Sequence, residues 1–362
     1  MAEVNNRFGY VDTLRGIAIF LVLSVHTSQF YQLGSELYTF ARYGQLGVQL
    51  FFVASAYTLC ISMSNVDLNT ENLKKFYIRR YFRIAPMYYI GIGMYFGINC
   101  VLYLLKKANF LELYDFKGIS SNLLLIHAFL PKYNNSIVPG GWSIATEVLF
   151  YFLFPFLYSF VKNFSFRKII YLIVLYTLIH VFVLIFAGKF LQFEKIENNS
   201  FYYYSIINQF PVFLCGIAMF KVIKYSNVKK KFFGSVFFIS FILLIFIWQF
   251  NELFSFVLIP VFSGIAFMSL GCLLSIIDYR FKLIELIGKL SYSIYIFHFV
   301  FSWYIIVLID KKIFFLGINI YLLYSIYLLI TLVFSVLIGL FTEKYIERYF
   351  VGVGKKIISN SI

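Results

Sequence analysis

Charged residues are scarce in this chain of 362 residues. Asp, Glu, Lys and Arg together make up 13% of it, whereas 61% is hydrophobic and 22% is aromatic. A soluble domain usually carries about 25% charged residues and about 45–50% apolar ones. A water-soluble fold of this size could not bury so much apolar surface. The composition therefore argues against an ordinary soluble enzyme, a disordered chain, a coiled coil and a collagen-like chain.

Cysteine and histidine are also rare, with four of each. The cysteines lie in apolar runs without Cys-x-x-Cys spacing: Cys60, Cys100, Cys215 and Cys272. This pattern supports neither a disulfide framework nor a zinc site, so we expect small packing residues and no metal.

Long apolar segments dominate instead. A membrane-spanning helix needs about 20 mostly apolar residues, and ten segments qualify: 12–31, 46–63, 84–105, 142–161, 168–187, 202–222, 233–249, 254–276, 290–309 and 319–342. The first shows no small-residue cleavage site, so we expect a retained span and not a signal peptide. Two connections are longer, the basic 64–83 and the stretch 106–141, in which 120–130 is typical of an interfacial or re-entrant piece. The sequence predicts an all-α polytopic membrane protein with about ten transmembrane helices.

The basic residues divide unevenly between the two sides of this predicted bundle. Of the 31 Lys and Arg residues, 22 lie on the side of both termini and nine on the other. Basic residues gather on the cytoplasmic side of membrane proteins, so both termini are predicted to be cytoplasmic. The net charge of +15 then mainly reports orientation, and no nucleic-acid partner is needed. We expect one transmembrane domain over 1–350 and a short basic cytoplasmic tail over 351–362.

Several ionisable residues lie inside predicted spans, where they are costly and usually face a cavity or a partner. Arg15 and His26 are eleven residues apart, which places them on one helix face about 16.5 Å apart along the axis. Glu147 should lie at a depth similar to that of His26, so a His–Glu pair is geometrically possible, and such a carboxylate makes the imidazole a better base. The alternative is that each residue meets its own polar neighbour. Ser143 precedes Glu147 by one turn and could be a hydrogen-bonding partner or a nucleophile.

Three arginines cluster at the cytoplasmic start of the third span. Arg83 follows Arg79 by four residues and Arg80 by three, so on a helix the three arginines form one compact surface. Guanidinium groups bind phosphates through two hydrogen bonds. The cluster is either a phosphate-binding site or a basic flank that contacts lipid headgroups.

A polar stripe marks the ninth span. Ser291, Tyr295 and His298 follow one another at intervals of four and three residues, which suits either a polar cavity or hydrogen bonds between helices. The other two histidines, His127 and His180, have no such company and are interpreted as ordinary buried residues.

Taken together, these segments resemble the acyltransferase 3 family of polytopic membrane proteins. The resemblance rests on five motifs in order: Asp12-Thr13-Leu14-Arg15-Gly16 with His26 eleven residues after the arginine, Gly47 to Tyr57, Arg80-x-x-Arg83 before Pro86, Trp142-Ser143-x-x-x-Glu147, and Ser291 to His298. Ala56 departs from the pattern, since the family usually has glycine after the serine, and a tight helix contact would be loosened there.

The resemblance implies transfer of an acyl group, most often acetyl, from cytoplasmic acyl-CoA to a sugar hydroxyl. Typical acceptors are surface polysaccharides, lipopolysaccharide among them, or their lipid-linked precursors in the bacterial inner membrane. It implies His26 as base, Glu147 as its orienting partner and Arg15, Arg79, Arg80 and Arg83 as acyl-CoA-binding residues. Trp142, Tyr295 and His298 would then contact the acceptor.

Other functions remain open at this point. A transporter or flippase for a glycan or small solute would also suit ten helices with buried charges, and a purely structural envelope protein is a third possibility. Within the enzyme hypothesis, acyl transfer is either direct or passes through His26 or Ser143.

Overall fold

The computed structural model of the chain describes residues 9–29, 35–105, 114–187, 201–250, 253–277, 281–313 and 319–360. Every regular element within these ranges is helical, and ten helical stretches among them are long and apolar enough to cross a membrane. The prediction of an all-α, multi-pass membrane protein is confirmed. The cytoplasmic placement of the termini and the single-domain boundary at 350 stay predictions.

The chain divides into two compact units. The first comprises 1–14, 49–73 and 146–280, and the second comprises 15–48, 74–145 and 281–362. The division runs through helices α2 (Gly9–Ser28), α4 (Gly47–Met63), α5 (Thr70–Leu104) and α7 (Gly141–Val161). Each unit is described by itself.

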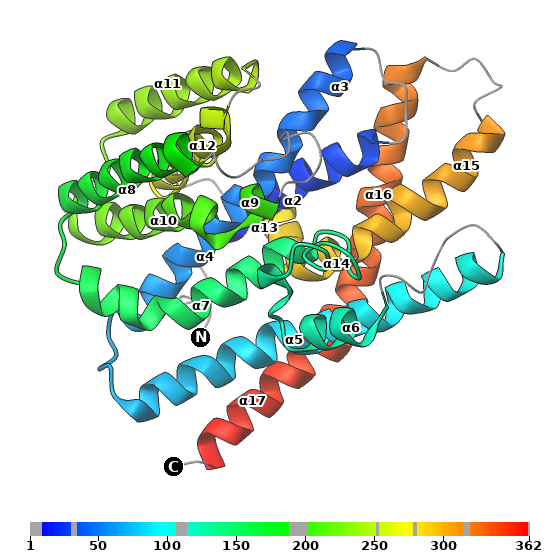
Figure 1. Cartoon of the computed structure of the whole chain (residues 1–362), viewed down its shortest axis with the longest axis horizontal. Helices are drawn as coiled ribbons and strands as arrows, with labels where there is room; N and C mark the ends of the chain where they lie inside the picture. Colours follow the sequence, from blue (N-terminus) through cyan, green and yellow to red (C-terminus); the bar gives the residue numbers. More distant parts are fainter. Residues whose placement is uncertain are drawn as a thin grey trace. The chain divides into compact units, whose positions relative to one another are not determined.

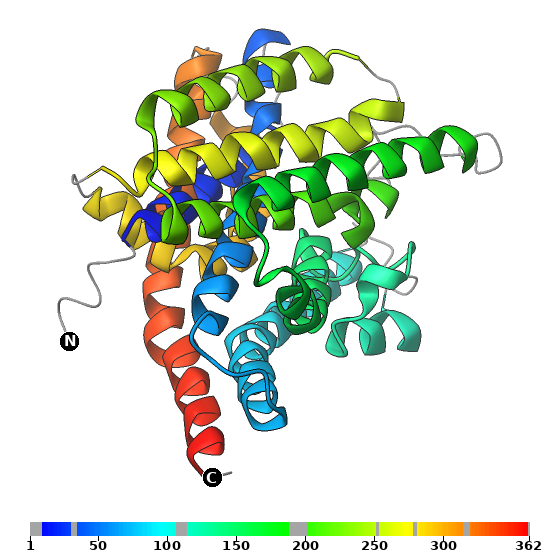
Figure 2. The same ribbon diagram turned by 90° about the vertical axis from the view of Figure 1, so that its left-hand side faces the viewer.

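The first unit contains a layer of long helices, which lie side by side in both views (Figures 1 and 2). In this layer α12 packs against both α10 and α11, and α8 packs against α10 and α12. The helices are α8 (Phe166–Ala187), α9 (Phe201–Tyr204), α10 (Ile206–Tyr225), α11 (Lys230–Trp248) and α12 (Leu253–Leu274). The predicted span 202–222 is interrupted at Ser205, because its hydroxyl accepts a hydrogen bond from the Asn208 amide and caps a new helix.

Helices α4 and α10 approach closely at Gly216. A Cβ at this position would lie 2.4 Å from the carbonyl oxygen of Val53 and 2.7 Å from the Cβ of Ala56. The methyl group of Ala56 is therefore accommodated by a glycine on the facing helix. The tight helix contact that Ala56 put in doubt is retained at this point.

The second unit is arranged around α14 (Ser291–Phe299), whose neighbours bond to its backbone or pack on it. Tyr95 on α5 donates to the carbonyl oxygen of Ile296 at 2.8 Å, and Gly339 packs against Leu290 and Ile294. The remaining helices of this unit are α3 (Ser35–Arg42), α6 (Phe116–Leu123), α13 (Lys282–Lys289), α15 (Ile306–Ile313), α16 (Ile320–Thr342) and α17 (Arg348–Asn360). These contacts hold the polar stripe of α14 inside the unit.

Helix α5 begins earlier than hydropathy suggests. The basic stretch 64–83 was expected to be a connection, but the helix starts at Thr70 and continues through Pro86 to Leu104. The side chain of Asn69 accepts a hydrogen bond from the Asn72 amide at 2.8 Å and caps this start. The three arginines are consequently displayed on a continuous helix.

Two other spans also differ from the expected simple helices. The ninth consists of α14, a π-helical segment (Val300–Ile305) and α15. The tenth continues past Thr342 through a second π-helical segment (Glu343–Glu347) into α17, so the predicted tail 351–362 is helical as far as Asn360, and residues 361–362 lie outside the described residues. π-Helical turns occur frequently at functional sites, and the first of these begins at Val300, two residues after His298.

Candidate functional site

Near the end of α2, His26 is held by the side chain of Gln29. The Nδ1 atom of His26 lies 3.2 Å from Gln29 Oε1, and the indole nitrogen of Trp303 donates to the same oxygen at 3.1 Å. An indole N–H can only donate, so the atom it meets must be the amide oxygen. The same oxygen accepts from His26, which places the proton of a neutral imidazole on Nδ1. The lone pair is then on Nε2, and His26 is half-buried.

A second imidazole lies next to the first. The ring centroids of His26 and His298 are 5.3 Å apart, and Phe299 contacts both rings at 4.4 and 4.0 Å. The Nδ1 atom of His298 donates to the carbonyl oxygen of Tyr295 at 2.8 Å. Its Nε2 atom is buried without a hydrogen-bond partner among the described residues. A buried acceptor without a partner costs about 1–3 kcal/mol, so this atom suits a donor supplied by a ligand.

The structure also brings Ser143 and Tyr295 together. Ser143 Oγ lies 2.7 Å from the Tyr295 hydroxyl, and both lie within hydrogen-bonding distance of the carbonyl oxygen of Gly140, at 2.9 and 3.1 Å. Gly140 has a φ of +76°, a conformation that favours glycine. This node fastens the start of α7 to α14, with Trp142 buried beside it. The described contacts of Ser143 are those of a hydrogen-bonding partner, while its role as a nucleophile stays a prediction.

Behind this node, His127 supports the first residue of α7. Its Nε2 atom lies 3.1 Å from both the Tyr88 hydroxyl and the carbonyl oxygen of Gly141, and Tyr88 donates to Asn122 at 2.8 Å. Burial lowers the pKa of His127 to about 4. A neutral, hydrogen-bonded His127 fits the interpretation of an ordinary buried residue.

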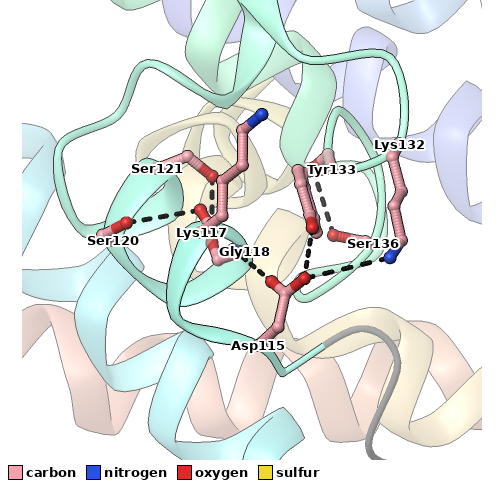
Figure 3. A network of polar contacts seen from close by, with 8 residues as sticks. All are labelled: Asp115, Lys117, Gly118, Ser120, Ser121, Lys132, Tyr133 and Ser136. Carbon is pink, nitrogen blue, oxygen red and sulfur yellow. Dashed lines mark hydrogen bonds and ion pairs between the residues drawn. The ribbon is translucent and has the colours of Figure 1, made fainter.

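The segment between α5 and α7 is tied by a polar network around Asp115 (Figure 3). The Asp115 carboxylate caps α6 by accepting from the Gly118 amide at 2.6 Å and also accepts from the Tyr133 hydroxyl. These hydrogen bonds, Tyr133 first, lower the pKa of Asp115, and Lys132 at 3.9 Å adds a smaller attraction. The network thus joins the start of α6 to Lys132 and Tyr133, in the stretch that leads to Gly140.

The predicted acyl-CoA-binding arginines lie on two helices of the second unit. Arg79 and Arg83 are exposed one turn apart on α5, whereas Arg80 is half-buried with its guanidinium 5.6 Å from the ring centroid of Phe76. Arg83 interacts electrostatically with Glu347. Arg15 is half-buried on α2, eleven residues before His26. The interpretation of one compact surface is refined, because Arg79 and Arg83 form an exposed stripe and Arg80 packs at its side.

Helix α17 runs beside this part of α5, as Figure 1 shows. A Cβ on Gly354 would lie 3.0 Å from the Cβ of Phe82, so the two helices approach closely there. Lys355 and Lys356 are exposed on α17. The predicted tail is thus packed against the helix that carries the arginines.

Glu147 lies in the first unit and bonds within its own helix. It accepts from the Tyr151 hydroxyl at 2.6 Å, and Tyr151 in turn accepts from Ser55 at 3.3 Å. Because His26 belongs to the second unit, the His26–Glu147 pair stays a prediction. The group bonded to His26 Nδ1 in the second unit is Gln29.

Gln29, Trp303 and Gly140 were not among the residues that the sequence singled out. Gln29 follows His26 by three residues, a spacing that brings side chains together on a helix, and could have been found. The Pro139-Gly140 dipeptide is a turn signal. Trp303 is 274 residues from Gln29 in the chain, and no local pattern connects the two.

Comparison with known proteins gives a consistent result. Residues 8–340 match the acyltransferase 3 family model, described as an acyltransferase domain. The chain is 26% identical over 165 residues to the acyltransferase MdmB of Streptomyces mycarofaciens, covering 43% of this chain and 40% of that protein. It is 29% identical over 164 residues to the peptidoglycan O-acetyltransferase OatA of Listeria monocytogenes, covering 42% of this chain and 24% of that protein.

A third relative is an uncharacterized protein of Haemophilus influenzae, 25% identical over 202 residues, with 51% of this chain and 76% of that protein covered. The matches to the two named relatives thus span less than half of each protein's length. No solved structure matches the chain.

Proposed function

Because this chain belongs to the acyltransferase 3 family, we propose that it is an integral-membrane O-acyltransferase. Its donor is cytoplasmic acyl-CoA, and its acceptor is a hydroxyl of a cell-envelope polysaccharide or of its lipid-linked precursor. We propose acetyl as the acyl group and the bacterial inner membrane as the location. The name of the Listeria relative, a peptidoglycan O-acetyltransferase, supports an acetyl donor and an envelope glycan.

The observation that carries this proposal is the state of His26. Its Nδ1 atom is committed to Gln29, so Nε2 has the lone pair that a general base needs. In the proposed reaction Nε2 takes the proton of the acceptor hydroxyl while its oxygen attacks the thioester carbonyl carbon. The carbon–sulfur bond then breaks, and the CoA thiolate receives the proton from His26. The products are the O-acyl ester and CoA.

The donor is proposed to bind at the exposed face of α5. Arg79 and Arg83 offer two guanidinium groups to the CoA phosphates, with Arg80 beside them. Arg15 lies about 16.5 Å from His26 along α2, and we propose that it binds a part of CoA between the phosphates and the thioester. This placement lets the phosphates stay at the predicted cytoplasmic end while the thioester reaches inwards.

The acceptor is proposed to bind on the side of His298. The Tyr295 hydroxyl is already engaged with Ser143 and Gly140, and Trp142 is buried. His298 Nε2 therefore offers the open hydrogen-bond acceptor of this group. The Ser143 hydroxyl donates to Gly140, so we propose direct transfer to the acceptor without an acyl-serine. Glu147 stays a proposed partner of His26: its carboxylate, which accepts from Tyr151, would stabilise positive charge on the imidazole.

The test combines gene deletion with NMR of the surface polysaccharide. We expect an ester resonance to disappear on deletion and to return with the wild-type gene, but not with His26→Ala at equal protein level. His180→Ala serves as the matched control, because His180 lies in the first unit and bonds to Tyr202. Full restoration by His26→Ala would contradict the base assignment.

A second measurement separates an enzyme from a transporter. Purified protein is incubated with radiolabelled acetyl-CoA and a membrane fraction from the deletion strain. An acyltransferase moves the label into the glycan, whereas a transporter or flippase leaves it on CoA. Label that stays on CoA with wild-type protein would refute the proposed activity.

A further inference from the structure

Gln29 and Trp303 form a small hydrogen-bonded unit around one ring nitrogen of His26. We propose that Gln29 is the positioning residue that holds His26 with its proton on Nδ1, and that Trp303 holds the Gln29 amide in the orientation this requires. The inference rests on the proposed role of His26 as a base. It adds two residues that act on that base without contacting the substrate.

The hydrogen bonds leave one consistent arrangement. Trp303 Nε1 lies 3.1 Å from Gln29 Oε1, and an indole nitrogen has no lone pair to accept a hydrogen bond. If the amide were rotated, its NH2 group would face the indole N–H, and two donors would point at each other. Gln29 therefore presents oxygen to Trp303. A carbonyl oxygen has two lone pairs, and the second meets His26 Nδ1 at 3.2 Å.

The rings around His26 oppose any other orientation of the imidazole. Phe299 lies 4.4 Å from the His26 ring centroid and also 4.4 Å from Trp303, so it fills the space between the two. Trp303 itself approaches the His26 ring nearly edge-on, with centroids 6.0 Å apart. The imidazole is thus held by packing as well as by the hydrogen bond.

The π-helical segment provides a reason for the position of Trp303. It begins at Val300, directly after α14, and contains Trp303. A π turn is wider than an α turn and redirects the side chains that follow it. Here it brings the indole N–H to Gln29 while His298 stays on α14.

His298 also carries its proton on Nδ1, but backbone carbonyls and not a side chain accept it. The carbonyl oxygens of Tyr295 and Ile294 lie 2.8 and 3.3 Å from its Nδ1 atom, so Nδ1 carries the proton. Two adjacent imidazolium ions within a membrane would repel each other. The pair therefore has room for one added proton. His298 is fully buried and His26 only half-buried, so the proton is placed on His26, where Gln29 accepts from Nδ1–H of the resulting imidazolium.

A purely structural role for Gln29, as the first residue after α2, predicts something different. In that case its loss would lower stability without changing the tautomer of His26. The two roles separate in a spectroscopic measurement, because the 15N chemical shifts and couplings of an imidazole distinguish a proton on Nδ1 from one on Nε2.

The experiment uses the full-length protein, labelled with 15N-histidine and reconstituted in lipid nanodiscs. The His26 signals are identified as those missing in His26→Ala. Three variants are compared with wild type: Gln29→Leu, which removes the acceptor, Gln29→Glu, which keeps acceptor oxygens, and Trp303→Phe, which removes only the indole N–H. Gln249→Leu is the matched control, since Gln249 is an exposed residue at the end of α11 in the first unit.

We expect wild type, Gln29→Glu and Gln249→Leu to show the His26 proton on Nδ1. Gln29→Leu should move it to Nε2 or to a mixture, and acyl transfer should fall at least about tenfold, the effect of losing roughly 1.4 kcal/mol of hydrogen bonding. Gln29→Glu should recover most of this loss, and Trp303→Phe should give an intermediate mixture.

An unchanged His26 tautomer in Gln29→Leu would overturn the proposal. If Gln29→Leu does not fold, an unchanged His26 tautomer in Trp303→Phe overturns it instead. If the tautomer moves as expected but neither Gln29→Leu nor His26→Ala reduces acyl transfer, the positioning by Gln29 stands and the base assignment fails. The failure of this inference and that of the proposed function are thus distinguishable.

Discussion

Replacing Gly140 with alanine should disrupt the node that joins α7 to α14. An L-residue at a φ of +76° costs about 1–2 kcal/mol. The added Cβ would lie 2.8 Å from the Tyr295 hydroxyl and 3.2 Å from the nearest atom of Phe299. The hydroxyl must move, and losing its hydrogen bonds costs about 0.5–1.5 kcal/mol each. We expect Gly140→Ala to lower the free energy of unfolding by about 2–5 kcal/mol.

The assay is thermal unfolding of the purified protein in detergent, together with acyl transfer. Gly93→Ala is the matched control, because a Cβ on that glycine meets nothing within 4 Å on α5. This control should be unchanged or more stable by about 0.5–1 kcal/mol, the usual gain of alanine over glycine in a helix. Since Phe299 also contacts His26 at 4.4 Å, acyl transfer should fall in Gly140→Ala and not in the control.

A double-mutant cycle tests the cause of the loss. In Gly140→Ala/Tyr295→Phe the clashing hydroxyl is absent, so the two changes should be non-additive by about 1 kcal/mol. Equal stability of Gly140→Ala and Gly93→Ala would refute the reasoning about backbone strain. Full additivity in the cycle would refute the clash with Tyr295.

Three further outcomes follow from other parts of the molecule. Arg79→Ala/Arg83→Ala should weaken acyl-CoA binding at least tenfold in a titration of purified protein, since each charge-assisted hydrogen bond contributes about 1.5–3 kcal/mol; unchanged affinity would remove these residues from the donor site. Gly216→Ala should lower the unfolding temperature, because its Cβ would meet a backbone carbonyl of α4 at 2.4 Å and overpacking costs about 1–3 kcal/mol, whereas Gly234→Ala, with nothing within 4 Å, should not. Burial lowers the pKa of His127 from its ordinary 6.5 to about 4, so the unfolded chain binds this proton first as the pH falls. The contribution of neutral His127 to stability is therefore complete above pH 6.5 and is lost as the pH falls towards 4. In His127→Gln, the free energy of unfolding should change less steeply with pH over this range.

Much of the site's chemistry was visible in the sequence, but its contacts were not. The spacing of Ser291, Tyr295 and His298 predicts a polar stripe, and the structure confirms that these residues share the buried helix α14. The expected connection 64–83 was wrong from Thr70 onwards. The apolar run from which hydropathy predicts a span begins only at residue 84. The helix itself begins at Thr70, where Asn69 caps it.

By itself the sequence determined the class of the protein, its number of spans and the arginine and histidine motifs of its family. These properties follow from the local order of residues, because hydrophobic length and helical spacing are read along one segment at a time. The tertiary structure decided which nitrogen of His26 carries the proton. That depends on an indole 274 residues from Gln29 in the chain, on a π-helical turn that aims it, and on a ring packed between them. A hydrogen bond acts over about 3 Å, and only folding brings its donor and acceptor that close.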